Sequence, residues 1–521
     1  MTPRLRGISG NCRPKERIVK KCRLCCLVIL FLVFCQVRVS IAKTLRVASF
    51  ETDVPGITPL AQSFDPDSYI LISQIFNSLI EFDLNGKKVP ALAISWKQVN
   101  PTTYQFDLRK GVKFQNGDDF TAQDVKYTFE TAVDPKTKAG SAWILNTIKK
   151  VDIIDPYKVN IELTHPDGMF LYRITMFGAI CPGNYIKKVG LDEFNKNPIG
   201  TGPFKFVRWD KGKEIVLAKN PGYWKTGLPH YDELDFMIMP EAQWAGALAA
   251  GKVDLITDVP LADRAAVAGN KNLKTMQRLV LESYWAMLRN KGPLAHVRVR
   301  QALNHALNKD ELIKVQAGGQ GVPMASLGME HEEGQNPNLK PYPYDVAKAK
   351  SLMAAAGYPN GFTIKAISID DATPLNEVIV KDLAAIGVKV EMETVSRPDF
   401  AKRVVVGKIT GHPYEGDMAI DLVDNPIIDM SFHAGLFLAS SSPWALLNDP
   451  AYDKKFLWTQ LMADPAQHIS ALQALDQYIH DQALMLFTIQ PVRMFAMKKE
   501  VTIPGIGLNG HIDYVVFSEA N

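Results

Sequence analysis

Apolar and polar residues alternate along this chain in two ways, at the spacing of a β-strand in some stretches and of an α-helix in others. The first pattern predicts strands at residues 43–50, 104–108, 112–114, 151–163 (two short strands), 215–218, 234–239, 253–256 and 388–394, with 104–114 as a hairpin. The second predicts helices at residues 68–79, 242–250, 297–312, 345–356, 373–386 and 466–483. A further helix is expected to begin at Thr121, with Asp124 completing a capping box. Because strands and helices interleave throughout, we expect an α/β fold.

The first 42 residues differ in kind from the rest. Basic residues lead into an apolar run at 24–37, and small residues follow at Ser40 and Ala42. This order is typical of a signal peptide, with cleavage predicted after Ala42. A transmembrane anchor is the alternative, but the run is shorter than the ~20 residues of a spanning helix, and Arg38 closes it. A lipid anchor at Cys35 is disfavoured because bulky Phe34 precedes it. We therefore expect an exported protein.

Removal of this leader changes the charge and the cysteine content. The whole chain carries 59 Lys and Arg against 55 Asp and Glu, a formal net charge of +4. Nine of the basic residues and one acid lie in the leader, so the mature chain is expected to carry −4. The basic balance therefore does not indicate a nucleic-acid partner. Five of the six cysteines also lie in the leader, which leaves Cys181 alone and excludes an intramolecular disulfide.

Motifs of catalytic and cofactor chemistry are weak. Residues 505–510 match G-x-G-x-x-G, but too few residues follow for a dinucleotide-binding unit, so we interpret them as a loop. His331 has no second histidine one helical turn away, which leaves a zinc site unsupported. The chain has no G-x-S-x-G nucleophile motif. We predict no metal, no cofactor and no catalytic residue, and a secreted hydrolase with an unmarked site remains an alternative.

Four ordered stretches resemble one protein family. They are AISW, YQFDLRKGVKF, NG and TAQDVKYTFE within 93–130, PIGTGPF and NPGYW within 198–224, PLAHVRVRQALNHAL at 293–307, and YDVAKAKSLMAAAGYPNGF at 344–362. Together they resemble the signature of bacterial extracellular solute-binding proteins of family 5, the oligopeptide, dipeptide, nickel and opine binders. The resemblance spans roughly Lys43 to Phe517. We interpret most of these residues as structural, with Arg298 and Arg300 anchoring their helix.

The resemblance implies a two-lobed periplasmic binding protein of type II, cluster C, with a hinged ligand cleft. Lobe I would comprise 43–285 with an inserted subdomain at about 75–190, lobe II 286–490, and a C-terminal return to lobe I 491–521. Such a protein would be a periplasmic monomer that captures a small polar solute and passes it to the permease of an ABC importer.

The resemblance also suggests ligand-binding residues in the first lobe and between the lobes. Family members use residues just after the first strand, which here are Glu51 and Thr52. Trp143 and Trp285 are candidates for stacking on a ligand, and Tyr69 is a candidate for reaching the cleft. For each aromatic residue a place in the core is the alternative.

A second group of candidates lies in the C-terminal half. In peptide-binding members an aspartate in a G-W-x-x-D-like segment holds the ligand's α-amine, but residues 417–426 lack the Gly-Trp pair. Asp421 or Asp424 is expected to take this role, and His433 to face the cleft. Lys402 and Arg403 lie on a predicted helix, where they would meet an anionic ligand or form a solvated face. The best expectation for the solute is an opine, such as an agrocinopine-like sugar phosphodiester, and a short peptide is the runner-up.

Overall fold

The computed structural model describes residues 7, 42–50, 52–61 and 66–519. The chain divides into two compact units, Met1–Lys43 and Thr44–Asn521. The predicted signal peptide lies almost entirely outside the described residues, so its cleavage stays a prediction. Within the part that is described, no helix is both long enough and apolar enough to span a membrane.

The first sheet contains the N-terminal strand of the second unit and a strand from near the C-terminus. Its strands lie in the order β12 (Leu273–Leu279), β19 (Ile489–Lys498), β11 (Leu255–Ile256), β1 (Thr44–Phe50), β10 (Glu233–Ile238), β9 (Glu214–Lys219) and β8 (Phe204–Asp210), with β14 (Gly321–Pro323) paired to β19. Strand β1 runs parallel to β10 and β11, whereas β19 is antiparallel to β11 and β12. Helices α2 (Pro66–Ile75), α8 (Trp244–Ala249) and α9 (Arg264–Gly269) pack against this sheet.

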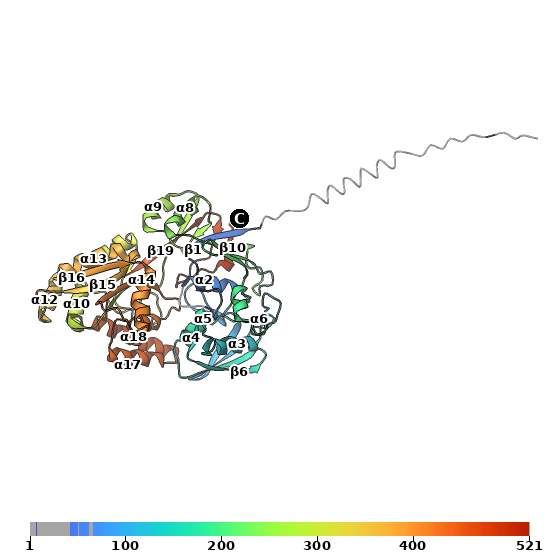
Figure 1. Ribbon diagram of the computed structural model, residues 1–521, viewed down its shortest axis with the longest axis horizontal. Coiled ribbons are helices and arrows are strands. Elements are labelled where there is room, and N and C mark those ends of the chain that lie inside the picture. Colours follow the sequence, from blue (N-terminus) through green and yellow to red (C-terminus); the bar gives the residue numbers. More distant parts are fainter. Residues whose placement is uncertain (1–6, 8–41, 51, 62–65, 520–521) are drawn as a thin grey trace, which may run out of the picture. The chain divides into compact units, whose positions relative to one another are not determined.

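A four-stranded antiparallel sheet forms a subdomain between β1 and β8 in sequence. Its order is β4 (Ala93–Asn100), β5 (Thr103–Leu108), β7 (Lys158–Leu163) and β6 (Ile148–Asp155). The accompanying helices are α3 (Ala122–Val133), α4 (Ala142–Leu145), α5 (Phe170–Phe177), α6 (Gly183–Val189) and α7 (Leu191–Lys196). Two short strands, β2 (Ile80–Phe82) and β3 (Lys88–Pro90), form a separate hairpin. This subdomain and α2 lie in the blue and cyan part of the ribbon, which also includes β1 (Figure 1).

The second large sheet is built from the C-terminal half of the chain. Its order is β16 (Val388–Val395), β15 (Phe362–Ile369), β17 (Met418–Asp424), β13 (Glu282–Leu288) and β18 (Met485–Leu486). Strand β15 is parallel to β16 and β17, and β13 is antiparallel to β17. The helices of this half are α10 (Val297–Ala306), α11 (Lys309–Ala317), α12 (Val346–Ala355), α13 (Thr373–Ala384), α14 (Arg397–Ala401), α15 (Gly407–Ile409), α16 (Ser431–His433), α17 (Pro450–Gln460) and α18 (Pro465–Gln482). Helix α13 packs against β15 and β16, and α10 packs against α12 and β18 (Figure 1).

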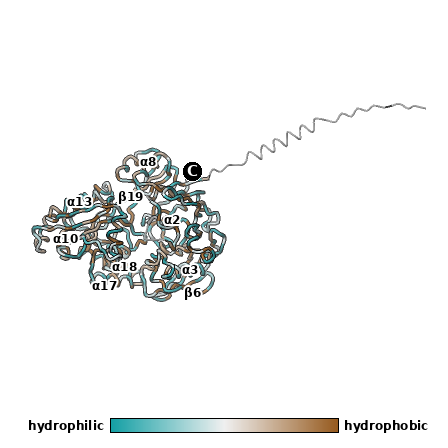
Figure 2. The backbone as a smooth tube through the Cα atoms, viewed as in Figure 1, coloured by the Kyte–Doolittle hydropathy of each residue, from teal (hydrophilic) through white to brown (hydrophobic). Residues whose placement is uncertain are grey.

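Each large sheet has its own hydrophobic core. The first core includes Phe50, Phe106 and Phe236, and the second includes Trp285 and Phe400. Hydrophobic and hydrophilic stretches alternate along the backbone in both halves (Figure 2), as expected when each element buries one face. Apart from β14, which pairs with the first residues of β19, the chain passes from the first sheet to the second between Leu279 and Glu282, and returns between Leu486 and Ile489. The protein is thus a two-lobed α/β structure, while the lobe boundaries proposed at 285/286 and 490/491 stay a prediction.

Two local predictions were wrong. The hairpin partner of β5 is β4, and residues 112–114 form only a single bridge, from Lys113 to Asp119. Strand β4 was missed because most of its residues are exposed and show no apolar alternation. The helix predicted at 297–312 is broken into α10 and α11. Asn308 caps α11 by accepting a hydrogen bond from the backbone N–H of Glu311, so the chain starts a new helix there.

Candidate functional site

The carboxyl ends of the parallel strands meet at the junction of the two lobes. In the first sheet β1, β10 and β11 share one direction, and in the second sheet β15, β16 and β17 do. Strand β12 leaves the first sheet at this carboxyl edge, and β13 enters the second sheet with Glu282 opposite Asp424, the last residue of β17. Ligands of α/β proteins bind outside the carboxyl ends of strands. The junction is therefore where the topology places a binding site.

Charged side chains gather at this junction. We call the following residues the junction cluster: Asp258, Glu282, Asp371, Arg397, Asp421, Asp424 and Arg493. Asp258 follows β11 in the first sheet, Glu282 begins β13, and Arg493 lies on β19. The cluster thus joins the first sheet to the second, and its carboxyl groups outnumber its guanidinium groups.

Arg493 is the cation at the centre of the junction cluster. Its guanidinium pairs with the Glu282 carboxylate, and both side chains are largely buried. Burial alone would lower the pKa of Arg493, but the negative charges of Glu282, Asp258 and Asp424 outweigh it and raise the pKa. Arg493 therefore stays charged and is shared among three carboxyl groups.

Asp258 and Asp424 are carboxyl groups with little compensation. Burial raises the pKa of Asp424 to about 7, and the nearby charge of Glu282 adds to this effect. Burial raises the pKa of Asp258 to about 6, although Arg493 opposes the shift. Among the described residues, no side chain donates a hydrogen bond to the carboxyl of Asp258 or of Asp424. The Asp258 carboxyl accepts a hydrogen bond from the backbone N–H of Val259, at 2.7 Å. A cation at the junction would stabilise the ionised form of both.

Arg397 presents a guanidinium at the solvent side of the cluster. It lies in the first turn of α14, whose N-cap is Ser396. Its Nη1 donates to Asp421 at 3.1 Å and to the carbonyl of Leu422 at 2.9 Å, and its Nη2 donates to Asp371 at 3.2 Å. The Arg397 side chain is 46% exposed, whereas that of Asp421 is only 2% exposed. The buried Asp421 carboxylate thus fixes the position of Arg397 through this ion pair, while the Arg397 side chain stays partly accessible to an anion.

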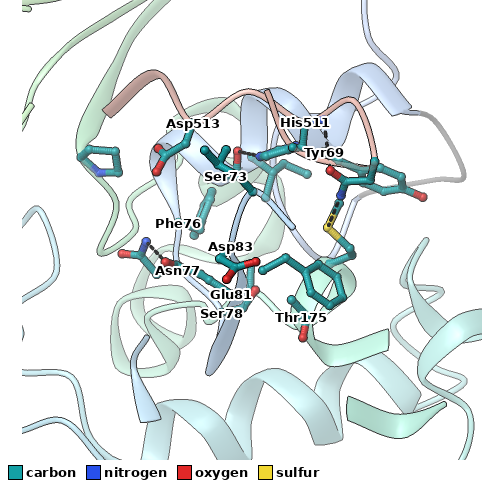
Figure 3. Close-up of a pocket in the computed structure, with 18 of the residues that line it drawn as sticks. Tyr69, Ser73, Phe76, Asn77, Ser78, Glu81, Asp83, Thr175, His511 and Asp513 are labelled. Carbon is teal, nitrogen blue, oxygen red and sulfur yellow. Dashed lines mark hydrogen bonds between the residues drawn. The ribbon is translucent and has the colours of Figure 1, made fainter. Parts of the chain in front are cut away.

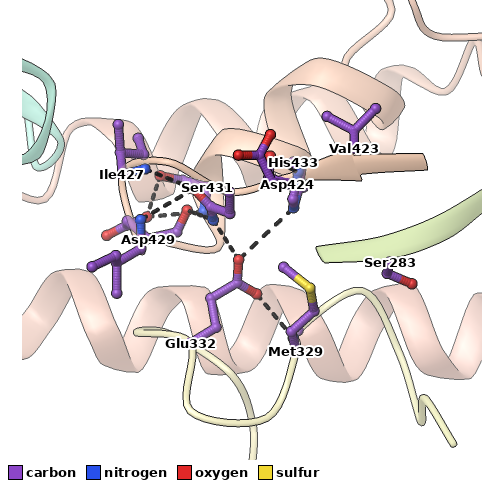
Figure 4. Close-up of polar contacts among 12 residues, drawn as sticks. Ser283, Met329, Glu332, Val423, Asp424, Ile427, Asp429, Ser431 and His433 are labelled. Atoms are coloured by element: carbon purple, nitrogen blue, oxygen red, sulfur yellow. Dashed lines mark hydrogen bonds and ion pairs between the residues drawn. The ribbon is translucent and has the colours of Figure 1, made fainter. Parts of the chain in front are cut away.

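His433 and Trp285 support the end of β17 from inside the second lobe. His433 is fully buried, and burial lowers its pKa to about 3, so the ring is neutral. Its Nε2 donates to the backbone carbonyl of Asp424 at 3.0 Å (Figure 4). Trp285 packs on His433 at 4.7 Å between ring centroids and donates from Nε1 to the carbonyl of Val423 at 3.0 Å. Both rings therefore hold Asp424 in place from the core.

A buried acid lies behind His433. Glu332 accepts hydrogen bonds from the backbone N–H of Met329 and from the Asn425 side chain, and its Oε1 lies 3.9 Å from His433 Nδ1 (Figure 4). Burial raises the pKa of Glu332 well above its usual value. Burial therefore favours the protonated, uncharged form of Glu332.

The first-lobe candidates form a different group. Glu51 lies outside the described residues, and Thr52 follows β1 at an exposed position. Tyr69 on α2 is buried and meets Phe177 edge-on at 4.8 Å, and Trp143 on α4 meets the same ring at 6.0 Å. Trp143 remains 43% exposed, which leaves part of its indole available for stacking. The structure thus brings Tyr69 and Trp143 together through Phe177, apart from Asp421 and Asp424.

Arg403 and Lys402 lie on a separate surface. Both belong to the π-helical turn η5 (Lys402–Val406). The Arg403 guanidinium binds both oxygens of Glu393, at 2.6 and 2.8 Å, next to Lys365 and Tyr414. Lys402 is exposed. These contacts favour the alternative of a solvated helix face, because an anionic ligand would have to compete with Glu393.

Several residues of the junction cluster were missed from the sequence. Asp258 and Arg397 follow predicted strands within three residues, so the rule that sites lie at the carboxyl ends of strands could have found them. Glu282 and Arg493 are 211 residues apart and meet only because the chain crosses between the sheets twice. Among the described residues, no group of three or more His, Cys, Asp and Glu side chains is placed to hold a metal ion. Cys181 is buried, which raises the pKa of its thiol and makes it a poor nucleophile.

Comparison with known proteins identifies the family. The model of the bacterial extracellular solute-binding proteins, family 5 (middle region), matches residues 87–421, which is more than half of the chain. The chain belongs to this family. It is 33% identical over 370 residues to heme-binding protein A of Haemophilus influenzae, covering 65% of this chain and 68% of that protein. It is 30% identical over 350 residues to the glutathione-binding protein GsiB of Pectobacterium atrosepticum, covering 65% and 67%.

A solved structure shows the same architecture in a relative. The periplasmic binding protein DppA from Helicobacter pylori, in complex with the peptide STSA, is 27% identical, with a TM-score of 0.77 over 91% of this chain and 98% of that one. This confirms the two-lobed fold of the periplasmic binding proteins. The protein is therefore a solute-binding protein of an ABC importer of the family 5 type, from a family that is periplasmic in bacteria.

Proposed function

We propose that this protein captures a short peptide, or a peptide-like zwitterion with a free amine and a free carboxylate. The observation that carries the proposal is the pair of poorly compensated carboxyl groups, Asp258 from the first lobe and Asp424 from the second. A ligand ammonium group would bind at these carboxyls, and a ligand carboxylate at Arg397. The solute would then pass to the transmembrane subunits of the permease, with the protein acting as a periplasmic monomer.

The amine is the anchor of this proposal. The carboxyl of Asp424 has a pKa of about 7 because burial and the nearby charge of Glu282 disfavour its ionised form, although Arg493 opposes the shift. An ammonium group supplies the missing positive charge and donates up to three hydrogen bonds. A hydrogen bond to a charged group contributes about 1.5–3 kcal/mol. Asp424 is favoured over Asp421 as the amine ligand, because Asp421 is already paired with Arg397 and is nearly inaccessible.

Binding across the junction explains how the ligand would change the conformation. A ligand shifts an equilibrium between open and closed lobes only if it binds one form more tightly. An ammonium group that contacts both Asp258 and Asp424 makes its full set of contacts only when the lobes approach each other. The two crossings, at 279–282 and 486–489, are the segments that would bend as the hinge.

A peptide fits the junction better than the sugar phosphodiester that was first expected. A phosphodiester carries no amine and would bring negative charge to a cluster with excess carboxyl groups. The cations proposed for that ligand, Lys402 and Arg403, lie on another surface. The descriptions of two relatives also support a peptide, since GsiB is called a glutathione-binding protein and the DppA structure is a complex with the peptide STSA.

Calorimetry of the mature chain, residues 43–521, tests the proposal. We expect the tetrapeptide STSA or glutathione to bind, and the same peptide with an acetylated N-terminus to bind at least tenfold more weakly, because its amine is blocked. Equal binding of the free and acetylated peptides would refute the role of the amine. Binding of a sugar phosphodiester but of no peptide would restore the opine proposal.

A product assay separates binding from hydrolysis. We expect chromatography of the peptide after prolonged incubation with the protein to recover it unchanged, because the junction holds no activated nucleophile or base–nucleophile pair among the described residues. Cleaved peptide in the presence of the wild-type protein, but not of Asp424→Asn, would instead favour the secreted hydrolase.

A further inference from the structure

A pocket of about 120 Å³ lies in the first lobe and shares no residue with the junction cluster (Figure 3). Its walls come from α2, from β2 and the turn after it, from α5, and from the C-terminal segment 507–513. The polar groups that enter the argument below are Asn77, Glu81, Tyr223, Lys225, His511 and Asp513. Segments far apart in the sequence thus converge on one pocket that is partly open to solvent.

The pocket has an excess of negative charge. Lys225 pairs with Glu81 at 2.8 Å, and Asn77 also donates to Glu81, at 3.1 Å. Asp513 lies near the same pair, so one ammonium group serves two carboxyls. Burial raises the pKa of Asp513 to about 6, and the charge of Glu81 adds to this. Burial lowers the pKa of His511 to about 4, so this ring is neutral and adds no positive charge.

The rest of the lining mixes polar residues (Ser73, Ser78, Asp83, Thr175 and Asn509) with aromatic and apolar ones. Phe76, Phe82 and Tyr223 contribute rings, and Ala179 and Met176 contribute apolar surface. Aromatic faces attract ammonium groups, and apolar walls accommodate an alkyl chain. A cavity of about 150 Å³ in another protein holds benzene, so a pocket slightly smaller suits a ligand of about five or six non-hydrogen atoms.

We propose that this pocket is a second binding site, specific for a small primary alkylamine. The ammonium group lies beside Glu81 and Asp513, and the alkyl chain packs against Phe76 and Tyr223. The site is independent of the solute site proposed at the junction. A neutral molecule of the same shape gains the apolar contacts but leaves the second carboxylate uncompensated, so charge decides the specificity.

Titration of the mature protein with n-butylamine at pH 7.5, followed by ligand-observed NMR, tests this site. We expect a dissociation constant of about 1 mM or tighter, and at least tenfold weaker binding of 1-butanol, which has the same chain without the charge. Asp513→Asn should weaken n-butylamine binding about tenfold or more. Asparagine can still accept the hydrogen bond from the backbone N–H of Val515, so the local fold should persist.

A further variant and a competition experiment keep the outcome decisive. Ala179→Leu places three more carbons in the pocket and should abolish amine binding without touching the carboxyls. Saturation of the proposed solute site with STSA should leave the n-butylamine affinity of the pocket unchanged, which separates the two sites. Equal binding of butylamine and butanol, undiminished butylamine binding by Asp513→Asn, or displacement of butylamine by STSA would each overturn the proposal.

Discussion

Replacement of Asp424 by asparagine should have opposite effects on stability and on ligand binding. Asparagine has the shape of the aspartate side chain but cannot ionise. The hydrogen bond from His433 goes to the backbone carbonyl of residue 424, so it should survive the change. The perturbation is therefore confined to one charge at the end of β17.

The stability effect follows from the pKa of Asp424. Its ordinary value is 3.8, and burial raises it to about 7 in the folded protein. A carboxyl whose pKa is raised by folding favours the folded state below pH 4, and this contribution is lost as the pH rises through 7. One pKa unit corresponds to 1.36 kcal/mol, so the ionised group destabilises the unliganded protein at pH 8 by roughly 1–3 kcal/mol after allowance for its partial exposure. The asparagine variant cannot ionise, so its free energy of unfolding does not fall in this way as the pH rises.

Urea denaturation of the unliganded mature protein at pH 5 and pH 8 measures this effect. We expect Asp424→Asn to exceed the wild type in free energy of unfolding at pH 8, with a smaller difference at pH 5. Calorimetry with STSA at pH 8 should show binding weakened tenfold or more, because a charge-assisted hydrogen bond is lost. Asp310→Asn, on an exposed position of α11, is the matched control and should change the stability by less than about 0.5 kcal/mol.

Two results would contradict this reasoning. If Asp424→Asn kept the pH dependence of the wild type between pH 5 and pH 8, another group would be titrating. If peptide affinity were unchanged, Asp424 would not be the amine ligand, whatever its effect on stability.

Other substitutions separate ligand contacts from structural ones. Arg397→Met should weaken binding of STSA tenfold or more in calorimetry, and should have little effect on the C-terminally amidated peptide, because only a free carboxylate needs the guanidinium. Arg300 donates to the carbonyls of Leu294, Ala295, Gln482 and Ala483, so Arg300→Ala should lower the free energy of unfolding by about 3 kcal/mol in urea without changing peptide affinity. Arg403→Ala should cost less than about 1 kcal/mol and leave solute affinity unchanged, since its pair with Glu393 is exposed; a loss of affinity would return Arg403 to the site.

Local elements could be predicted well because neighbouring residues determine them. Thr121 caps α3 and Asp124 completes the capping box, as expected from their spacing. Gly357 and Gly387 end their helices with positive φ, a conformation that glycine adopts without strain. The break at Asn308 shows the limit of such predictions, because the apolar spacing continues through 297–312. The Asn308 side chain caps the second helix, and the Asn308 backbone N–H donates a hydrogen bond to the Asp382 carboxylate.

The candidate site depends far more on tertiary structure. Asp421 and Asp424 could be named from one unusual segment of sequence, and their part in ligand binding stays a prediction, whereas His433, which was expected to face the cleft, is buried in the core. Glu282 and Arg493 could not be named in this way, because their pairing arises from two separate crossings between the lobes. The sequence by itself therefore determined the α/β class, most elements and the family. Only the tertiary structure decided which charges meet at the junction, because long-range packing sets the burial and the neighbours that give each carboxyl its pKa.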